Sequence, residues 1–193
     1  MKNDIILAGV GGQGILSIAA AIGLAAVNNN LYIKQAEVHG MSQRGGDVQS
    51  HLRISDAPIA SDLIPAGKAD LIISVEPMEA LRYLPMLSKD GWIVTNTVPF
   101  INITDYPQPE EVLAQVNAVK NHIAIDAEAI AKEAGSARAM NIVMLGAASL
   151  FLDIPFGKIE EGIRQLFGKK GNDVVELNLK ALRAGREFSE KNR

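Results

Sequence analysis

The sequence of 193 residues contains no cysteine. The chain therefore forms no disulfide bond, and it supplies no thiolate for a zinc site or an iron–sulfur cluster. A cysteine nucleophile is excluded for the same reason. Any cluster chemistry in which the chain takes part must use thiolates of another chain.

Long apolar runs and excess positive charge are also missing. The longest apolar stretch, residues 139–152, is too short to span a bilayer and contains Asn141. The formal net charge is −3, which gives no general attraction to nucleic acid. The first residues lead directly into a predicted strand, without the pattern of a signal peptide. We therefore expect a soluble, cytoplasmic protein without nucleic-acid or membrane partners.

Recognisable catalytic motifs are absent as well. There is no G-x-S-x-G nucleophile elbow and no P-loop ending. The three histidines, His39, His51 and His122, lack the spacing of a helical metal pair. The sequence predicts neither a catalytic residue nor a metal ligand in this chain.

A glycine-rich turn is the most informative feature that is present. Residues 9–14 read Gly-Val-Gly-Gly-Gln-Gly between an apolar run and an alanine-rich amphipathic segment. A strand, a glycine turn and a helix in this order can bind phosphate, because Gly9 permits the turn, Gly11 a close backbone approach and Gly14 close helix packing. Such turns also occur without a ligand, so both interpretations stay open.

Strands and helices alternate along the chain and predict an α/β fold. A period-two pattern at 48–54, followed by a turn and a short partner at 59–60, predicts an antiparallel hairpin. The expected fold is a single domain over residues 1–193, a Rossmann-like three-layer α/β domain with a mostly parallel sheet, the added hairpin and a helical C-terminal part. The expected strands are 5–8, 31–38, 71–75, 91–96 and 122–125; the expected helices are 12–27, 77–84, 127–134, 139–152, 155–167 and 173–190, with an irregular loop at 98–109.

The candidate binding residues follow the carboxyl ends of the predicted strands, where ligands collect in open α/β sheets. They are Gly9, Gly11, Gly12, Gln13, Gly14, Arg44, Gly45, Gly46, Glu76 and Asn96.

Several of these residues also fit ordinary structural roles. Arg44 beside two glycines can donate to a phosphate or carboxylate, or can belong to a plain surface loop. Glu76 before Pro77 also fits the start of a helix. Asp173 and Glu176 have the spacing of a capping box. The polar face of the expected hairpin, formed by Gln49, His51 and Arg53, is either solvated or covered by a partner subunit.

Three segments together carry a family resemblance. The chain resembles the gamma-type domain of CoA-dependent 2-oxoacid:ferredoxin oxidoreductases. The resemblance lies in the glycine turn, in residues 37–46 (Glu-Val-His-Gly-Met-Ser-Gln-Arg-Gly-Gly) and in residues 69–77, together with Asn96 and residues 141–146. The similarity covers essentially the whole chain. The form of residues 39–44 is similar to the small, beta subunits of the indolepyruvate branch, whereas pyruvate- and oxoglutarate-type relatives more often have a Gly-Pro-Glu element there.

The resemblance implies a role within a complex. Such complexes decarboxylate a 2-oxoacid, here an arylpyruvate, on thiamine diphosphate with magnesium, pass electrons through 4Fe-4S clusters to ferredoxin, and transfer the acyl group to CoA. The thiamine and cluster sites belong to the large subunit, which becomes the expected partner. This chain alone is then expected to hold no cofactor and to be inactive.

Two other classes share the glycine turn. A free-standing dinucleotide-dependent oxidoreductase would place Gly9, Gly11 and Gly14 on the pyrophosphate and an acidic residue, such as Glu37, on the ribose. Tight NADH binding would favour that class. An adenylating enzyme of the ubiquitin-activating type has a similar turn but often a cysteine-bound zinc, and ATP–pyrophosphate exchange would identify it.

Overall fold

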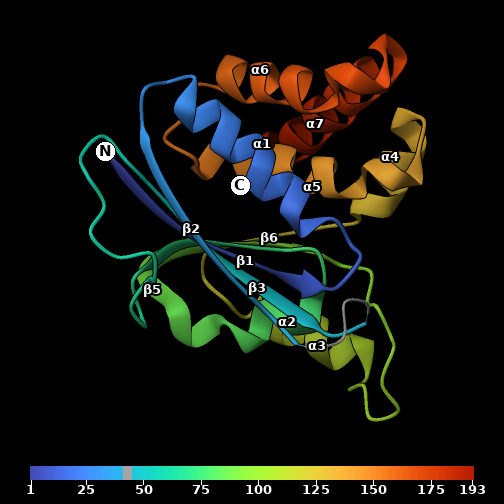
Figure 1. The fold of residues 1–193 in the computed structure, drawn as a ribbon. Helices are drawn as coiled ribbons and strands as arrows, with labels where there is room; N and C mark the ends of the chain where they lie inside the picture. Colours follow the sequence, from blue (N-terminus) through green and yellow to red (C-terminus); the bar gives the residue numbers. More distant parts are fainter. Residues whose placement is uncertain (41–44) are drawn as a thin grey trace.

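The computed structural model describes residues 1–40 and 45–193, which fold around one six-stranded sheet (Figure 1). The strand order is β2-β3-β1-β4-β5-β6. The strands are β1 Lys2–Val10, β2 Tyr32–His39, β3 Asp47–Ser55, β4 Ala69–Ser74, β5 Leu87–Asn96 and β6 His122–Ile125. The α-helices are α1 Ile15–Val27, α2 Pro77–Arg82, α3 Pro109–Asn117, α4 Ala127–Ala134, α5 Met140–Ala148, α6 Phe156–Phe167 and α7 Asn172–Asn192. Short 3-10 turns are η1 Leu84–Met86, η2 Ala137–Ala139, η3 Ser149–Phe151 and η4 Gly168–Lys170.

Helices cover both faces of the sheet. Helices α1 and α4 to α7 lie on one face, and α2 and α3 lie on the other (Figure 1). A hydrophobic core lies on each face of the sheet, and alternate residues of β1 contribute to each. Ile5 and Leu7 pack in the larger core, and Ile6 packs in the smaller one. A strand that is buried on both faces needs a continuous apolar run, which residues 5–8 provide. The expected three-layer α/β architecture is confirmed.

The antiparallel element differs from the expectation. Strand β3 pairs antiparallel with both β1 and β2, and residues 59–60 form no strand. The hairpin partner is therefore β2, and the prediction of a partner at 59–60 was wrong. Because β1 and β2 are each antiparallel to β3, they run in the same direction and end at the same edge of the sheet. Strands β1, β4, β5 and β6 are mutually parallel neighbours.

Two polar side chains of β3, those of His51 and Arg53, are largely covered by the chain itself. His51 is only 8% exposed, and its Nδ1 accepts a hydrogen bond from the Ile64 amide at 3.0 Å. Burial, with the nearby charge of Arg53, lowers the pKa of His51. Arg53 contacts the buried Asp4 and the carbonyls of Ser61 and Leu63. His51 and Arg53 are thus largely covered by the chain itself and do not form a solvated face.

Two helix predictions also need correction. Helix α3 was not expected, although Pro109 at its first position and two glutamates in its first turn are typical of a helix start. The proposed capping box of α7 does not form, because Gly171 occupies the N-cap and no side chain caps the helix. Glu176 instead contacts Nη1 of Arg164 at 3.0 Å.

Within residues 1–40 and 45–193, the helices are all too short or too polar to cross a membrane.

Candidate functional site

The glycine turn is held in shape by Gln13. Its Oε1 accepts from the Val10 amide at 2.8 Å, and its own amide donates to the Val10 carbonyl at 3.2 Å. Its Nε2 reaches the Val75 carbonyl, at the end of the neighbouring strand, at 3.5 Å. Gln13 therefore ties the turn to two strand ends, and its side chain points into the protein.

Three glycines of the turn have different physical roles. A Cβ on Gly9 would lie 2.3 Å from the Val75 side chain, and one on Gly14 would lie 2.6 Å from the amide nitrogen of Asn141. Both glycines permit close packing. Gly12 has a φ of 102°, which side chains rarely adopt, and a Cβ there would meet open space. Only Gly12 of these three combines a glycine conformation with free room beside it.

The second glycine loop lies against the first. The Gly11 amide donates to the Gly46 carbonyl at 2.8 Å, and the Gly45 amide donates to the Gly11 carbonyl at 3.3 Å. The structure therefore brings the two predicted loops together at one edge of the sheet. The Gly11 amide is not available to a ligand. Arg44 lies outside the described residues.

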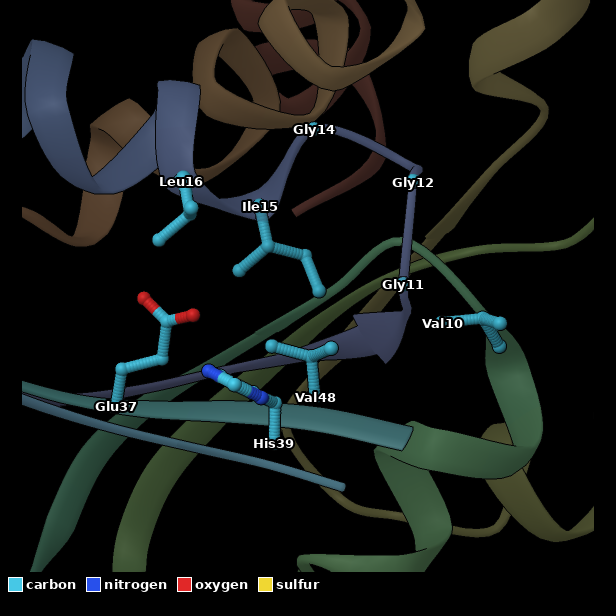
Figure 2. A pocket seen from close by; sticks show the side chains of 9 residues that line it. All are labelled: Val10, Gly11, Gly12, Gly14, Ile15, Leu16, Glu37, His39 and Val48. Atoms are coloured by element: carbon cyan, nitrogen blue, oxygen red, sulfur yellow. The ribbon is translucent and has the colours of Figure 1, made fainter. Parts of the chain in front are cut away.

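A cleft of about 360 Å³ opens between the turn, α1 and the ends of β2 and β3 (Figure 2). It is lined by Val10, Gly11, Gly12, Gly14, Ile15, Leu16, Glu37, His39 and Val48. Glu37 extends from β2 toward Leu16 of α1 (Figure 2). The first turn of α1 has no side-chain cap, and its Ser17 amide donates to the Gly14 carbonyl at 3.0 Å.

The chemistry of this cleft suits a ligand with hydrogen-bond donors. The Glu37 carboxylate accepts hydrogen bonds and repels a phosphate. His39 is the one basic side chain among the described lining residues, and its Nδ1 lies 3.0 Å from the Gly40 carbonyl. Ile15, Leu16 and Val48 supply an apolar wall. Hydroxyl or amide groups beside an apolar chain match these surroundings.

Glu76 is directed into the protein, not toward the cleft. It is 0% exposed and caps α2 by accepting from the Glu79 amide at 2.8 Å. It also accepts from the Tyr106 hydroxyl at 2.5 Å and the Phe100 amide at 3.4 Å. Burial, then the hydrogen bond to Glu76, raises the pKa of Tyr106. Glu76 therefore anchors the loop at 97–108, which corrects the expectation that it lies open to a ligand.

Asn96 also has a structural role. It is 1% exposed, and its Nδ2 donates to the carbonyls of Val75 and Val98 at 3.4 and 3.3 Å. Its Oδ1 accepts from the Ala127 amide at 3.1 Å. Asn96 joins three strand ends and does not line the cleft, so its contribution is to position the loops.

The sequence did not single out the surface of the loop at 97–108. Phe100, Ile101 and Ile103 are 43%, 62% and 47% exposed, and Asn102 donates from Nδ2 to the Gly45 carbonyl. An apolar surface thus stands beside the second glycine loop. No group of three or more His, Cys, Asp or Glu in the described part of the chain could hold a metal ion.

The family follows from comparison with known proteins. The family model for pyruvate ferredoxin/flavodoxin oxidoreductases matches residues 4–188. The chain belongs to this family. The expected gamma-type resemblance is therefore confirmed. The two alternatives, a dinucleotide-dependent oxidoreductase and an adenylating enzyme, are set aside.

Relatives within the oxidoreductase family match nearly the whole chain. The indolepyruvate oxidoreductase subunit IorB of Archaeoglobus fulgidus is 40% identical, with 96% of this chain and 94% of the relative covered. The corresponding subunit of Pyrococcus horikoshii is 38% identical over 95% of this chain and 94% of the relative. As in these subunits, the chain is one part of an oxidoreductase complex.

Solved structures of the family share the fold. Pyruvate oxidoreductase subunit PORC of Thermotoga maritima superposes with a TM-score of 0.73 at 23% identity, covering 96% of each chain. The 2-oxoglutarate:ferredoxin oxidoreductase of Magnetococcus marinus gives a TM-score of 0.77 at 22% identity, with 98% of this chain but 31% of that chain covered. The same domain is therefore found both as a separate chain and as part of a longer one.

Proposed function

We propose that the chain is the small subunit of a complex that oxidatively decarboxylates indolepyruvate, or a related arylpyruvate, to an acyl-CoA with ferredoxin as electron acceptor. The full-length similarity to the archaeal IorB subunits carries this proposal. CoA dependence is supported by the Magnetococcus relative, whose structure was solved with coenzyme A and succinyl-CoA bound.

The cofactors of the reaction belong to the large subunit. The described residues do not fit them, because the chain has no cysteine for a 4Fe-4S cluster and no cluster of metal-binding side chains for the magnesium of thiamine diphosphate. The contribution of this chain is then to bind and orient, through the cleft beside Gly12 and Glu37. Arg44 remains a predicted anion-binding residue of the adjacent loop.

The isolated chain is expected to contain no iron or sulfide and to show no turnover. Mixing it with the large subunit should produce CoA-dependent reduction of ferredoxin by indolepyruvate, because each chain lacks what the other supplies. Iron and sulfide analysis and an assay that omits each component in turn measure this. A large subunit that is fully active alone, or turnover without CoA, would contradict the proposal.

The large subunit also needs a docking surface, and the apolar loop at 97–108 is the proposed one. In the Magnetococcus enzyme this fold forms part of a longer chain, so other domains share that polypeptide. The loop is held at Phe100 and Tyr106 by the buried Glu76 and at Asn102 by Gly45. A pre-ordered apolar surface loses little entropy on binding, which favours its use as an interface.

Ile101→Asp is expected to weaken assembly with the large subunit at least tenfold. Burial of an isoleucine contributes about 1.5–3 kcal/mol, and each 1.4 kcal/mol is a factor of ten in affinity. Leu63→Asp is the matched control. Leu63 is similarly exposed, at 56%, but it lies outside the loop at 97–108, on the segment that contacts Arg53 of β3. Analytical ultracentrifugation of the mixed subunits gives both affinities. Equal affinities for the two variants would place the interface elsewhere.

A further inference from the structure

The two edges of the sheet differ in length and regularity. Strand β6, at one edge, has four residues, whereas β2, at the other edge, has eight. Strand β2 contains no proline, and its pairing with β3 runs from Tyr32 to His39 without a register shift. Natural sheet edges are usually short, or are interrupted by proline or a bulge, because a long regular edge pairs readily with another strand. The β2 edge has none of these protections.

The outer side of β2 has no partner strand in the described part of the chain. Strand β3 is the one neighbour of β2 in the sheet formed by residues 1–40 and 45–193. The lysine of β2, Lys34, crosses the sheet to Asp62, on the segment that follows β3, with Nζ 2.9 Å from the carboxylate. Its charge is therefore partly neutralised and does not protect the edge as an unpaired lysine would.

Two large apolar side chains stand exposed on one face of β2. Successive side chains of a strand point to opposite faces, and Ile33 packs against the larger core beneath α1. The even-numbered side chains therefore point to the other face. Among them, Tyr32 and Val38 are 50% and 52% exposed. Aromatic and β-branched side chains are among the best cross-strand pairs, so this face suits a partner strand with apolar residues at matching positions.

A second copy of β2 has apolar residues at those positions. An antiparallel ladder alternates between two kinds of facing pair, so a two-fold axis must pass through a pair that one residue forms with its own copy. With Gln35 on the axis, Tyr32 of each copy faces Val38 of the other. Lys34 of each copy then faces Ala36 of the other. Two aromatic–aliphatic pairs form on the same face, one on each side of the axis.

The neighbouring registers match less well. With Lys34 or Glu37 on the axis, two like charges would face each other, which is destabilising. With Ala36 on the axis, Lys34 would face Val38, and Tyr32 would face no residue of the other strand. In the register centred on Gln35, both charged side chains face uncharged ones. The sequence of β2 is therefore self-complementary in this one register among the four.

We propose that two copies of this chain associate through β2, antiparallel and centred on Gln35, so that their sheets join edge to edge. A complex built from the chain then holds it as a pair. The inference goes beyond the proposed function, because it depends neither on the substrate nor on CoA.

Analytical ultracentrifugation of the full chain, alone and assembled with the large subunit, tests the pairing. The unchanged chain should dimerise in a concentration-dependent manner. Two double variants then test the register. Tyr32→Lys/Val38→Glu puts opposite charges in both facing pairs, whereas Tyr32→Lys/Val38→Lys puts like charges there. The second should dimerise at least roughly tenfold more weakly than the first, because each dimer contains two such pairs. Circular dichroism establishes that both are folded.

The lack of cysteine allows a second test, of the geometry. Gln35→Cys puts one thiol of each chain beside the axis, where facing Cα atoms lie about 4.5–5.5 Å apart, within the range that a disulfide spans. Glu37→Cys is the matched control, since Glu37 is also exposed and lies on the same face as Gln35. Residue 37 of one copy faces residue 33 of the other, so these two thiols would lie roughly 13 Å apart along the strand. Under mild oxidation, Gln35→Cys alone should give a covalent dimer on a non-reducing gel.

Several outcomes would overturn the inference. They are a chain that stays monomeric alone and is present as a single copy in the complex, equal crosslinking of the two cysteine variants, and equal dimerisation of the two double variants. The two double variants can also differ in binding to the large subunit while self-association is unchanged. The β2 edge then pairs with that subunit, and the proposed pairing of two copies is wrong.

Discussion

The Gly146→Ala variant is expected to lose about 3 kcal/mol of unfolding free energy. A Cβ on Gly146 of α5 would lie 2.0 Å from the Leu182 carbonyl of α7, and one on Gly185 would lie 2.0 Å from the Val143 carbonyl. The two helix backbones are thus in direct contact through glycines on both sides. Overpacking usually costs about 1–3 kcal/mol, and a rigid backbone neighbour puts this site at the upper end.

Thermal denaturation followed by circular dichroism measures this loss. For a chain of this length, 1 kcal/mol corresponds to about 2–4 °C in Tm, so we expect Tm to fall by roughly 6–12 °C. Gly157→Ala in α6 is the control, since a Cβ there would meet nothing within 4 Å. In that position alanine should be neutral or slightly stabilising, because it restricts the unfolded chain. A similar loss in both variants would mean that the close crossing of α5 and α7 does not set the effect, because alanine has a higher helix propensity than glycine.

Much of the fold could be predicted because its signals are local. The bounds of β6 and α4 agree with the expected 122–125 and 127–134, since an alternating strand and an Asp126 cap are readable in sequence. The pairing of β3 was not readable. Its alternation shows a strand but cannot show which neighbours it has, and here it pairs with β1 and β2. Nor does the alternation show what covers its faces, where Ser50 and His51, on opposite sides, are both buried.

The candidate site shows the same limit. Strand ends place Glu76 and Asn96 at the correct edge of the sheet, but their partners decide whether they face a ligand. Those partners, such as Tyr106 and Ala127, are 30 and 31 residues away in sequence and belong to no recognisable motif.

Arg53→Met is expected to lower the stability of the isolated chain by about 3 kcal/mol, measured by urea denaturation. Its Nε and Nη2 lie 2.7 and 3.1 Å from the two carboxylate oxygens of Asp4, which is fully buried. Removal of one partner of a buried pair leaves an uncompensated charge and costs about 3–5 kcal/mol. Lys2, whose Nζ lies 2.7 Å from Asp4, compensates partly, so the lower end of this range applies.

The comparison with an exposed pair decides whether burial is the cause. Arg164→Met breaks a contact with Glu176 in which both side chains are about half exposed (48% and 53%), so it should cost less than about 1 kcal/mol. The double variant Asp4→Asn/Arg53→Met should be less destabilised than the sum of the single variants, because it leaves no buried carboxylate unpaired. If Arg53→Met is as stable as Arg164→Met but fails to bind the large subunit, Arg53 acts in assembly. Stability can instead fall while the remaining folded fraction assembles normally. The contact with Asp4 then stabilises the fold, and Arg53 is present in the alternating pattern of β3 because it forms an internal ion pair.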